Sequence, residues 1–216
     1  MNRIRKMFVF AACMMAAMCF LTGGSMAKSV QAAEKNGLVK QNGYWYYYEK
    51  GVKVVNEPRK VKITKNGVTR KYWCYFNAKG RAVMAKDHSD MGYKKNVTAV
   101  KYNGNYYGFD TSGHMVTNGY YNNPDKLKKD GQSYTYYFKS NGKCDLTKTN
   151  QIMKYGKYKA NAKYIRQILG KPLKEVKFNS CYDQPGTGYY LMYSTIRVSI
   201  HRFNNGSEIV FGIFPR

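Results

Sequence analysis

The chain has 216 residues, of which 37 are Lys or Arg and 12 are Asp or Glu, so its formal net charge is +25 at neutral pH. A chain this basic is expected to associate with polyanions. Three cysteines, Cys74, Cys144 and Cys181, lie beyond residue 32, and no Cys-x-x-Cys spacing occurs. An odd number without that spacing excludes a disulfide scaffold as the organising principle, although it leaves room for one bridge.

Residues 1–32 have the pattern of a secretory signal peptide. Three basic residues among the first six precede an uncharged apolar run from Met7 to Leu21, and the stretch VQAAEK fits cleavage before Ala33. The apolar run is too short for a typical membrane-spanning helix. We therefore expect a secreted chain with no integral membrane span after signal removal, in which 33 basic residues stand against 12 acidic ones.

A repeated phrase follows. Gly51 recurs as Gly80, Gly113 and Gly142, at intervals of 29, 33 and 29 residues, and the phrases that end on these glycines are YWYYYEKG, WCYFNAKG, YYGFDTSG and TYYFKSNG. Each phrase predicts a strand that enters a type I turn, which the glycine completes with a positive φ. We expect the strand to pair with the run after the glycine (VKVV, RAVM, HMVT or KCDL). Tandem hairpins that cover one another's apolar faces predict a β-hairpin solenoid over residues 33–149.

Each phrase has two faces, because alternate side chains of a strand point in opposite directions. The positions four and six residues before the glycine include Phe76, Phe109 and Phe138, and this face is predicted to form the core. The positions five and seven residues before it are rich in Tyr and Trp but unevenly filled, which predicts a half-exposed binding face. Its candidate ligand-binding residues are Tyr44, Tyr46, Trp73, Tyr75, Tyr106 and Tyr137. The residues leave open the alternative that these aromatics only pack the stack.

The phrases WCYFNAKG and NYYGFDTSGHM resemble the cell-wall-binding repeats of Gram-positive surface proteins, the choline-binding and glucan-binding repeat family. That family's unit runs from Gly-Trp through Trp-Tyr-Tyr-Phe and three polar residues to Gly-x-Met. The resemblance covers residues 37–149 and implies a hairpin solenoid that tethers a protein to a wall polymer or carbohydrate. Leu38, Val100 and Tyr120 occupy the Gly-Trp position, so we expect a complete aromatic cage for a quaternary ammonium at most near Tyr120, which joins the candidates. Sugar stacking, with lysines on phosphate or carboxylate, fits the composition better.

The pattern changes at residue 150. Apolar residues follow a helical period between 154 and 172, and Gly170 and Pro172 end it. The runs 173–182, 188–203 and 207–214 predict strands, with the turn NNG at 204–206. The overall prediction is a mainly β chain: the hairpin solenoid, followed at 150–216 by a small α+β domain of one helix and a three-stranded antiparallel sheet.

Catalytic patterns are few. Cys181 with His201 is the pair that a wall-modifying enzyme could use, but Cys181 stands in a strand-like run and not at a helix N-terminus, which would favour its thiolate. The scattered histidines predict no metal site, and no cofactor motif or glutamate pair for glycoside hydrolysis occurs.

The sequence therefore indicates a secreted, non-catalytic protein associated with the Gram-positive cell wall. Its predicted partner is a bacterial wall polymer, either teichoic acid or polysaccharide, with no specific nucleic acid, no cofactor and no metal. The alternative is a wall-modifying enzyme that the repeats target to its substrate through a C-terminal Cys181/His201 site.

Overall fold

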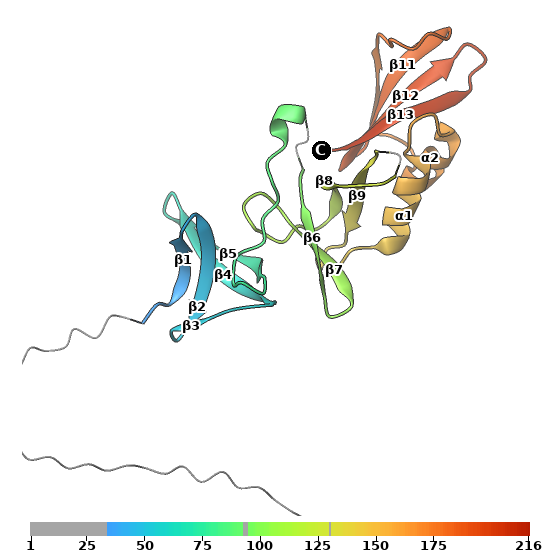
Figure 1. The fold of residues 1–216 in the computed structure, drawn as a ribbon. Coiled ribbons are helices and arrows are strands. Elements are labelled where there is room, and N and C mark those ends of the chain that lie inside the picture. Colours follow the sequence, from blue (N-terminus) through green and yellow to red (C-terminus); the bar gives the residue numbers. More distant parts are fainter. Residues whose placement is uncertain (1–33, 93–94, 130) are drawn as a thin grey trace, which may run out of the picture. The chain divides into compact units, whose positions relative to one another are not determined.

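The computed structural model describes residues 34–92, 95–129 and 131–216, and Glu34–Arg216 form one compact unit. The predicted signal peptide lies outside the described residues. The strands are β1 (Gly37–Gln41), β2 (Tyr44–Glu49), β3 (Val52–Lys53), β4 (Glu57–Lys65), β5 (Val68–Phe76), β6 (Thr98–Tyr102), β7 (Asn105–Phe109), β8 (Gly119–Leu127), β9 (Ser133–Phe138), β10 (Lys174–Phe178), β11 (Gly186–Met192), β12 (Ile196–Phe203) and β13 (Glu208–Pro215) (Figure 1). The helices are α1 (Leu146–Tyr155), α2 (Ala162–Leu169) and a 3-10 helix, η1 (Ser89–Met91). The predicted mainly β class is confirmed.

Each aromatic phrase pairs along its length with the strand before it, and only its end pairs with the run after its glycine. These short pairings join β2 to β3, Phe76 to Ala82, Phe109 to Met115 and Phe138 to Cys144. The antiparallel hairpins are β1–β2, β4–β5, β6–β7 and β8–β9. The first three turn on Asn-Gly, at 42–43, 66–67 and 103–104, and both residues of each turn have positive φ. This is the geometry of a type I′ turn, which matches the twist of the strands it joins. The predicted pairing is therefore present but short, and the prediction overlooked the longer hairpin with the preceding strand, which Asn-Gly signals in three of the four repeats.

The run after each glycine also connects successive hairpins. In three repeats its backbone N–H donates to the aromatic strand of the preceding repeat. These bonds run from Ala82 to the Trp45 carbonyl, from Met115 to the Trp73 carbonyl and from Cys144 to the Tyr106 carbonyl, each at 2.8 Å. The next residue along donates back to its own repeat's strand, as Val116 does to the Gly108 carbonyl at 2.9 Å. The predicted hairpin solenoid is therefore held together by backbone hydrogen bonds as well as by side chains.

The phenylalanines of the predicted core face lie inside. Phe76 and Phe138 have no exposed surface and Phe109 is 2% exposed. The glycines that end the phrases have positive φ, between 72° and 78°, as the turn requires. In the second repeat the N–H of Gly80 donates to the Asn77 carbonyl at 2.7 Å, which closes the turn. Aromatic alternation thus predicted the burial of these phenylalanines correctly, whereas Trp45, Tyr47 and Tyr107 of the same predicted face are only half-buried.

The C-terminal region has more elements than predicted. Two helices replace the single one expected at 154–172, because Asp145 caps α1 by accepting a hydrogen bond from the Lys148 N–H, and α1 ends at Gly156. The sheet has four strands in the order β10-β11-β12-β13. The run 188–203 is divided by a tight turn, in which the Tyr193 N–H donates to the Ile196 carbonyl at 2.9 Å.

Helix α1 spans the predicted domain boundary at 149, and the division at that residue stays a prediction. The core of the C-terminal region combines Ile152 of α1, Ile165 of α2 and the inner residues of the sheet with Tyr120 of β8. The last hairpin therefore contributes to this core. Among the described residues, none of the helices has the length and apolar character needed to cross a membrane.

Candidate functional site

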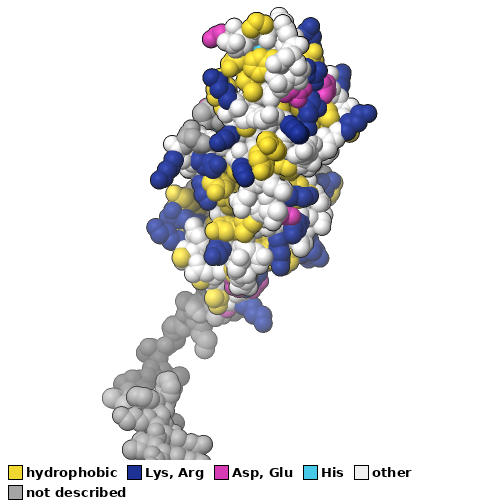
Figure 2. Space-filling view, turned by 90° about the vertical axis from the view of Figure 1, so that its right-hand side faces the viewer, with side chains coloured by type: hydrophobic (Ala, Val, Ile, Leu, Met, Phe, Trp, Pro, Cys, Tyr) yellow, Lys and Arg dark blue, Asp and Glu magenta, His cyan; other side chains and the backbone are white. Residues whose placement is uncertain are grey.

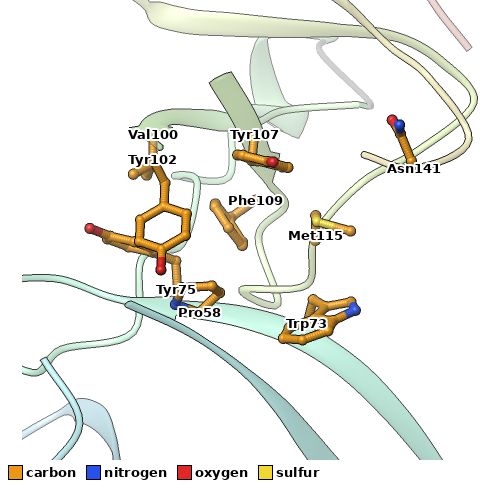
Figure 3. Close-up of a pocket in the computed structure, with 9 residues that line it drawn as sticks. All are labelled: Pro58, Trp73, Tyr75, Val100, Tyr102, Tyr107, Phe109, Met115 and Asn141. Carbon is orange, nitrogen blue, oxygen red and sulfur yellow. The ribbon is translucent and has the colours of Figure 1, made fainter. Parts of the chain in front are cut away.

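An open cavity of about 270 Å³ lies between hairpins β4–β5 and β6–β7 (Figure 3). Most of its wall is aromatic or sulfur-containing. These residues are Trp73, Tyr75, Tyr102, Tyr107, Phe109 and Met115. Figure 3 shows Tyr107 on one side of the space and Trp73 on the other, with Phe109 and Met115 between them. Two successive repeats thus contribute facing rings to one cavity.

Strand register explains how these side chains meet. Trp73 and Tyr75 are two residues apart on β5 and therefore share a face, and Pro58 of β4 stands opposite Tyr75. Tyr107 and Phe109 share a face of β7 in the same way. The backbone bond from Met115 to the Trp73 carbonyl holds the connecting run of the third repeat against the second. The cavity is a consequence of hairpin stacking.

The cavity combines an open mouth with a partly buried interior. Trp73 is 44% exposed, so a ligand can reach its ring from solvent. Tyr75 packs edge-on against Tyr102, with 5.9 Å between ring centroids, and burial together with this neighbour raises the pKa of the Tyr75 hydroxyl. None of the nine lining residues is acidic or basic, and Asn141 carries the one side-chain amide. Such a wall offers π faces to an apolar cation or to the face of a sugar ring.

The predicted site residues do not lie together in the structure. Trp73 and Tyr75 line the cavity. Tyr44 is 45% exposed on β2, and the Arg81 guanidinium lies 3.7 Å from its ring centroid. Tyr46 has the Lys53 ammonium 4.9 Å from its ring centroid. The rings of Tyr44 and Tyr46 on β2 are therefore covered in part by the protein's own cationic side chains.

The remaining candidates lie elsewhere. Tyr106 of β7 is half-buried and outside the cavity wall. Tyr120 is 5% exposed and packs edge-on against Tyr137 at 4.9 Å, and burial raises the pKa of its hydroxyl to about 12. The Tyr120 ring belongs to the C-terminal core, and the expectation of an aromatic cage near it stays a prediction. Tyr120 and Tyr137 also border a separate hollow, of about 400 Å³, which Lys148 and Lys171 share.

Of the nine lining residues, sequence reasoning named only Trp73 and Tyr75 as candidates. Three of the seven that it missed show the reasons. Tyr107 was assigned to the core because it stands six residues before Gly113. Tyr102 precedes the Asn-Gly turn, outside the repeated phrase. Met115 occupies the methionine position of the Gly-x-Met motif, which was the available signal.

The Cys181/His201 pair does not have the geometry of a nucleophile and its base. His201 is 1% exposed, its ring packs against Tyr182, Phe203 and Phe211, and its Nδ1 lies 3.1 Å from Ser180 Oγ. Cys181 is exposed, and within the described ranges no hydrogen bond joins it to His201. All three described cysteines are free thiols.

A metal site is also not found in this part of the chain: across residues 34–92, 95–129 and 131–216, no group of three or more His, Cys, Asp or Glu side chains could hold an ion.

Neither the family models nor the curated proteins that were compared with the chain gave a match. Solved structures did. The chain is similar to choline-binding domains. The choline-binding domain of Spr1274 from Streptococcus pneumoniae is 22% identical over 52% of this chain and 98% of that domain, with a TM-score of 0.30.

Two further structures match most of this chain but only part of their own length. The Cpl-1 endolysin of phage Cp-1, complexed with a peptidoglycan analogue, is 16% identical over 80% of this chain and 36% of the endolysin, with a TM-score of 0.34. Choline binding protein F from Streptococcus pneumoniae is 16% identical over 81% of this chain and 51% of that protein, with a TM-score of 0.28.

Proposed function

We propose that this protein is a secreted, non-catalytic cell-wall-binding protein that attaches to a Gram-positive wall polymer through the cavity between β4–β5 and β6–β7. The observation that supports the proposal is the meeting of Trp73, Tyr107 and Met115 from two repeats around one open space. The exposed edge of Trp73 makes the interior accessible to a group on a large polymer.

The aromatic lining of the cavity favours a quaternary ammonium group such as choline, for which the similar domains above are named. Such a group is apolar on its outside, has no hydrogen-bonding hydrogen and is attracted to several ring faces at once. A sugar ring also stacks on aromatic faces, but its hydroxyls need polar partners. The polar side-chain groups that line the cavity are the tyrosine hydroxyls, the Asn141 amide and the Trp73 indole N–H. We therefore place the quaternary ammonium first and the sugar ring second.

Co-sedimentation with purified Gram-positive walls tests the proposal. The chain from residue 33 onward should be retained on walls that carry choline and should be released by free choline. Trp73→Ala should weaken retention about 5- to 30-fold, because a ring over a quaternary ammonium contributes about 1–2 kcal/mol. Tyr158→Ala is the matched control, since Tyr158 is 59% exposed and lies away from the cavity. Equal retention of the two variants would contradict the proposal, and wall degradation abolished by Cys181→Ala would contradict its non-catalytic part.

A further inference from the structure

The face of hairpin β4–β5 that lines the cavity continues outward as a set of lysines. Residues that stand opposite each other and two apart along a strand share one face of a hairpin. In that order the rungs are Pro58 with Tyr75, Lys60 with Trp73, Lys62 with Lys71, and Thr64 with Thr69. The first two rungs contribute Pro58, Tyr75 and Trp73 to the cavity wall, and the last is closed by a 2.8 Å hydrogen bond between the two threonine hydroxyls. We call Lys60, Lys62 and Lys71 the lysine ladder.

The ladder carries uncompensated positive charge. All three lysines are exposed, and the ion pairs found in the described residues include none of them. The nearby acids Glu49 and Glu57 pair with Arg59, at 2.9 and 2.7 Å, on the opposite face of the hairpin. Figure 2 shows the same imbalance on the face in view, where Lys and Arg side chains are widely spread and Asp and Glu are few.

This arrangement opposes the stability of the hairpin. Lys62 and Lys71 stand directly opposite each other, and like charges at such positions destabilise a sheet. Like charges on paired strands that no acidic neighbour neutralises are unfavourable for folding, and such unfavourable arrangements are expected at functional sites. The lysines are also placed where a partner could use them, because Lys60 shares its rung with Trp73 at the cavity mouth.

We propose that the lysine ladder binds the phosphates of an anionic wall polymer of phosphodiester-linked units while a neighbouring group of that polymer occupies the cavity. Rungs two residues apart lie about 7 Å from each other, so the ammonium groups form a short row that leads away from Trp73. Lysine binds phosphate as a flexible point charge and needs no fixed geometry of the partner. The inference rests on the proposed function for the group in the cavity and adds a second, ionic contact with the same chain.

The test compares two variants of equal net charge, each in the chain from residue 33 onward. The ladder variant is Lys60→Thr, Lys62→Thr and Lys71→Thr. The control variant is Lys163→Gln, Lys174→Thr and Lys177→Thr, whose lysines are exposed on α2 and β10 and belong to none of the ion pairs found in the described residues. The probes are poly(glycerol phosphate), single-stranded DNA of similar length and vesicles of phosphatidylglycerol, and the dissociation constant is measured over a range of salt concentrations. Far-UV circular dichroism and thermal unfolding verify that both variants fold.

The ladder variant should bind poly(glycerol phosphate) on the order of tenfold more weakly than the control, with a salt dependence reduced by about one unit per lysine that contacts a phosphate. Equal losses in both variants would show attraction by net charge and overturn the inference. A loss confined to DNA or to vesicles would overturn the choice of polymer. If Trp73→Ala leaves wall retention unchanged while the ladder variant loses poly(glycerol phosphate), the proposed function fails and the ladder stands. If Trp73→Ala loses wall retention while the ladder variant binds poly(glycerol phosphate) as tightly as the control, the inference about the ladder fails and the proposed function stands.

Discussion

Phe138 of the fourth repeat occupies the space that a side chain at Gly108 of the third would take: a Cβ built on Gly108 lies 2.6 Å from Phe138 Cζ and 2.7 Å from Cε2. Gly108 stands at a position that holds Tyr46, Tyr75 and Tyr137 in the other repeats. The missing side chain is therefore part of how two hairpins stack. The uneven filling of this face has a packing cause at this position.

Gly108→Ala should destabilise the chain by about 1–3 kcal/mol, because an added methyl group in a well-packed core forces its neighbours to shift. Urea unfolding followed by circular dichroism measures the change. Phe138→Leu removes ring atoms from the same space, so the double variant should be less destabilised than the sum of the single ones. Additive effects would show that the two residues do not compete for this space.

The order of the hairpin strands was the part of the fold that the sequence could have predicted better. Asn66-Gly67 separates two strand-like runs, and Asn-Gly is the dipeptide that favours a type I′ hairpin turn; both residues have the positive φ that this turn requires. The glycine after each aromatic phrase also fits a hairpin turn, so a choice based on that glycine alone missed the main strand partner. The buried apolar residues change from odd positions (Leu191, Tyr193) to even positions (Ile196, Val198, Ile200), which marks the turn that was overlooked. Both signals are local.

The cavity could be predicted only in part, because it is formed by contacts between repeats. Alternation placed Trp73 and Tyr75 on an accessible face, and both line the cavity. The same alternation assigned Tyr107 to the core. Alternation along a strand shows on which face a side chain lies, but it does not show whether the neighbouring hairpin covers that side chain. Tyr102 meets the others only through stacking, which no spacing within one repeat can show.

The lysine ladder predicts a gain of stability on mutation. Lys71→Thr should raise the free energy of unfolding by about 0.2–1 kcal/mol, since it removes the charge opposite Lys62. Lys65→Thr is the matched control, because Lys65 is exposed on the same hairpin but stands opposite Val68, so it measures the effect of threonine alone. The difference between the two variants should disappear in high salt, where exposed charges are screened. Equal stabilities at low salt would contradict the repulsion.

Cys74 predicts a loss of stability in alkali. Burial of this thiol, with a smaller contribution from Asp110, raises its pKa from 9.0 to about 11 in the folded chain. Between these values the unfolded chain releases a proton that the folded chain keeps, so the free energy of unfolding falls as the pH rises from 9 towards 11.

Cys74→Val tests this, because valine is of similar size and does not titrate. Urea unfolding at pH 7 to 11 should show a shallower decline for the variant than for the parent above pH 9. The buried tyrosines, such as Tyr136, also have a raised pKa and account for the decline that remains. Parallel profiles would show that the Cys74 thiol is not protected by the fold.

The most direct test of the account uses the fluorescence of Trp73 during a titration with choline. The chain has two tryptophans, so Trp45→Phe leaves Trp73 as the single reporter at the cavity. Choline should then change the emission saturably, and the change should be lost when Tyr107→Ala is added, because that ring forms the facing wall. A response that survives in the Trp73→Phe variant and is absent from the Trp45→Phe variant, or no response in either, would contradict binding in the cavity.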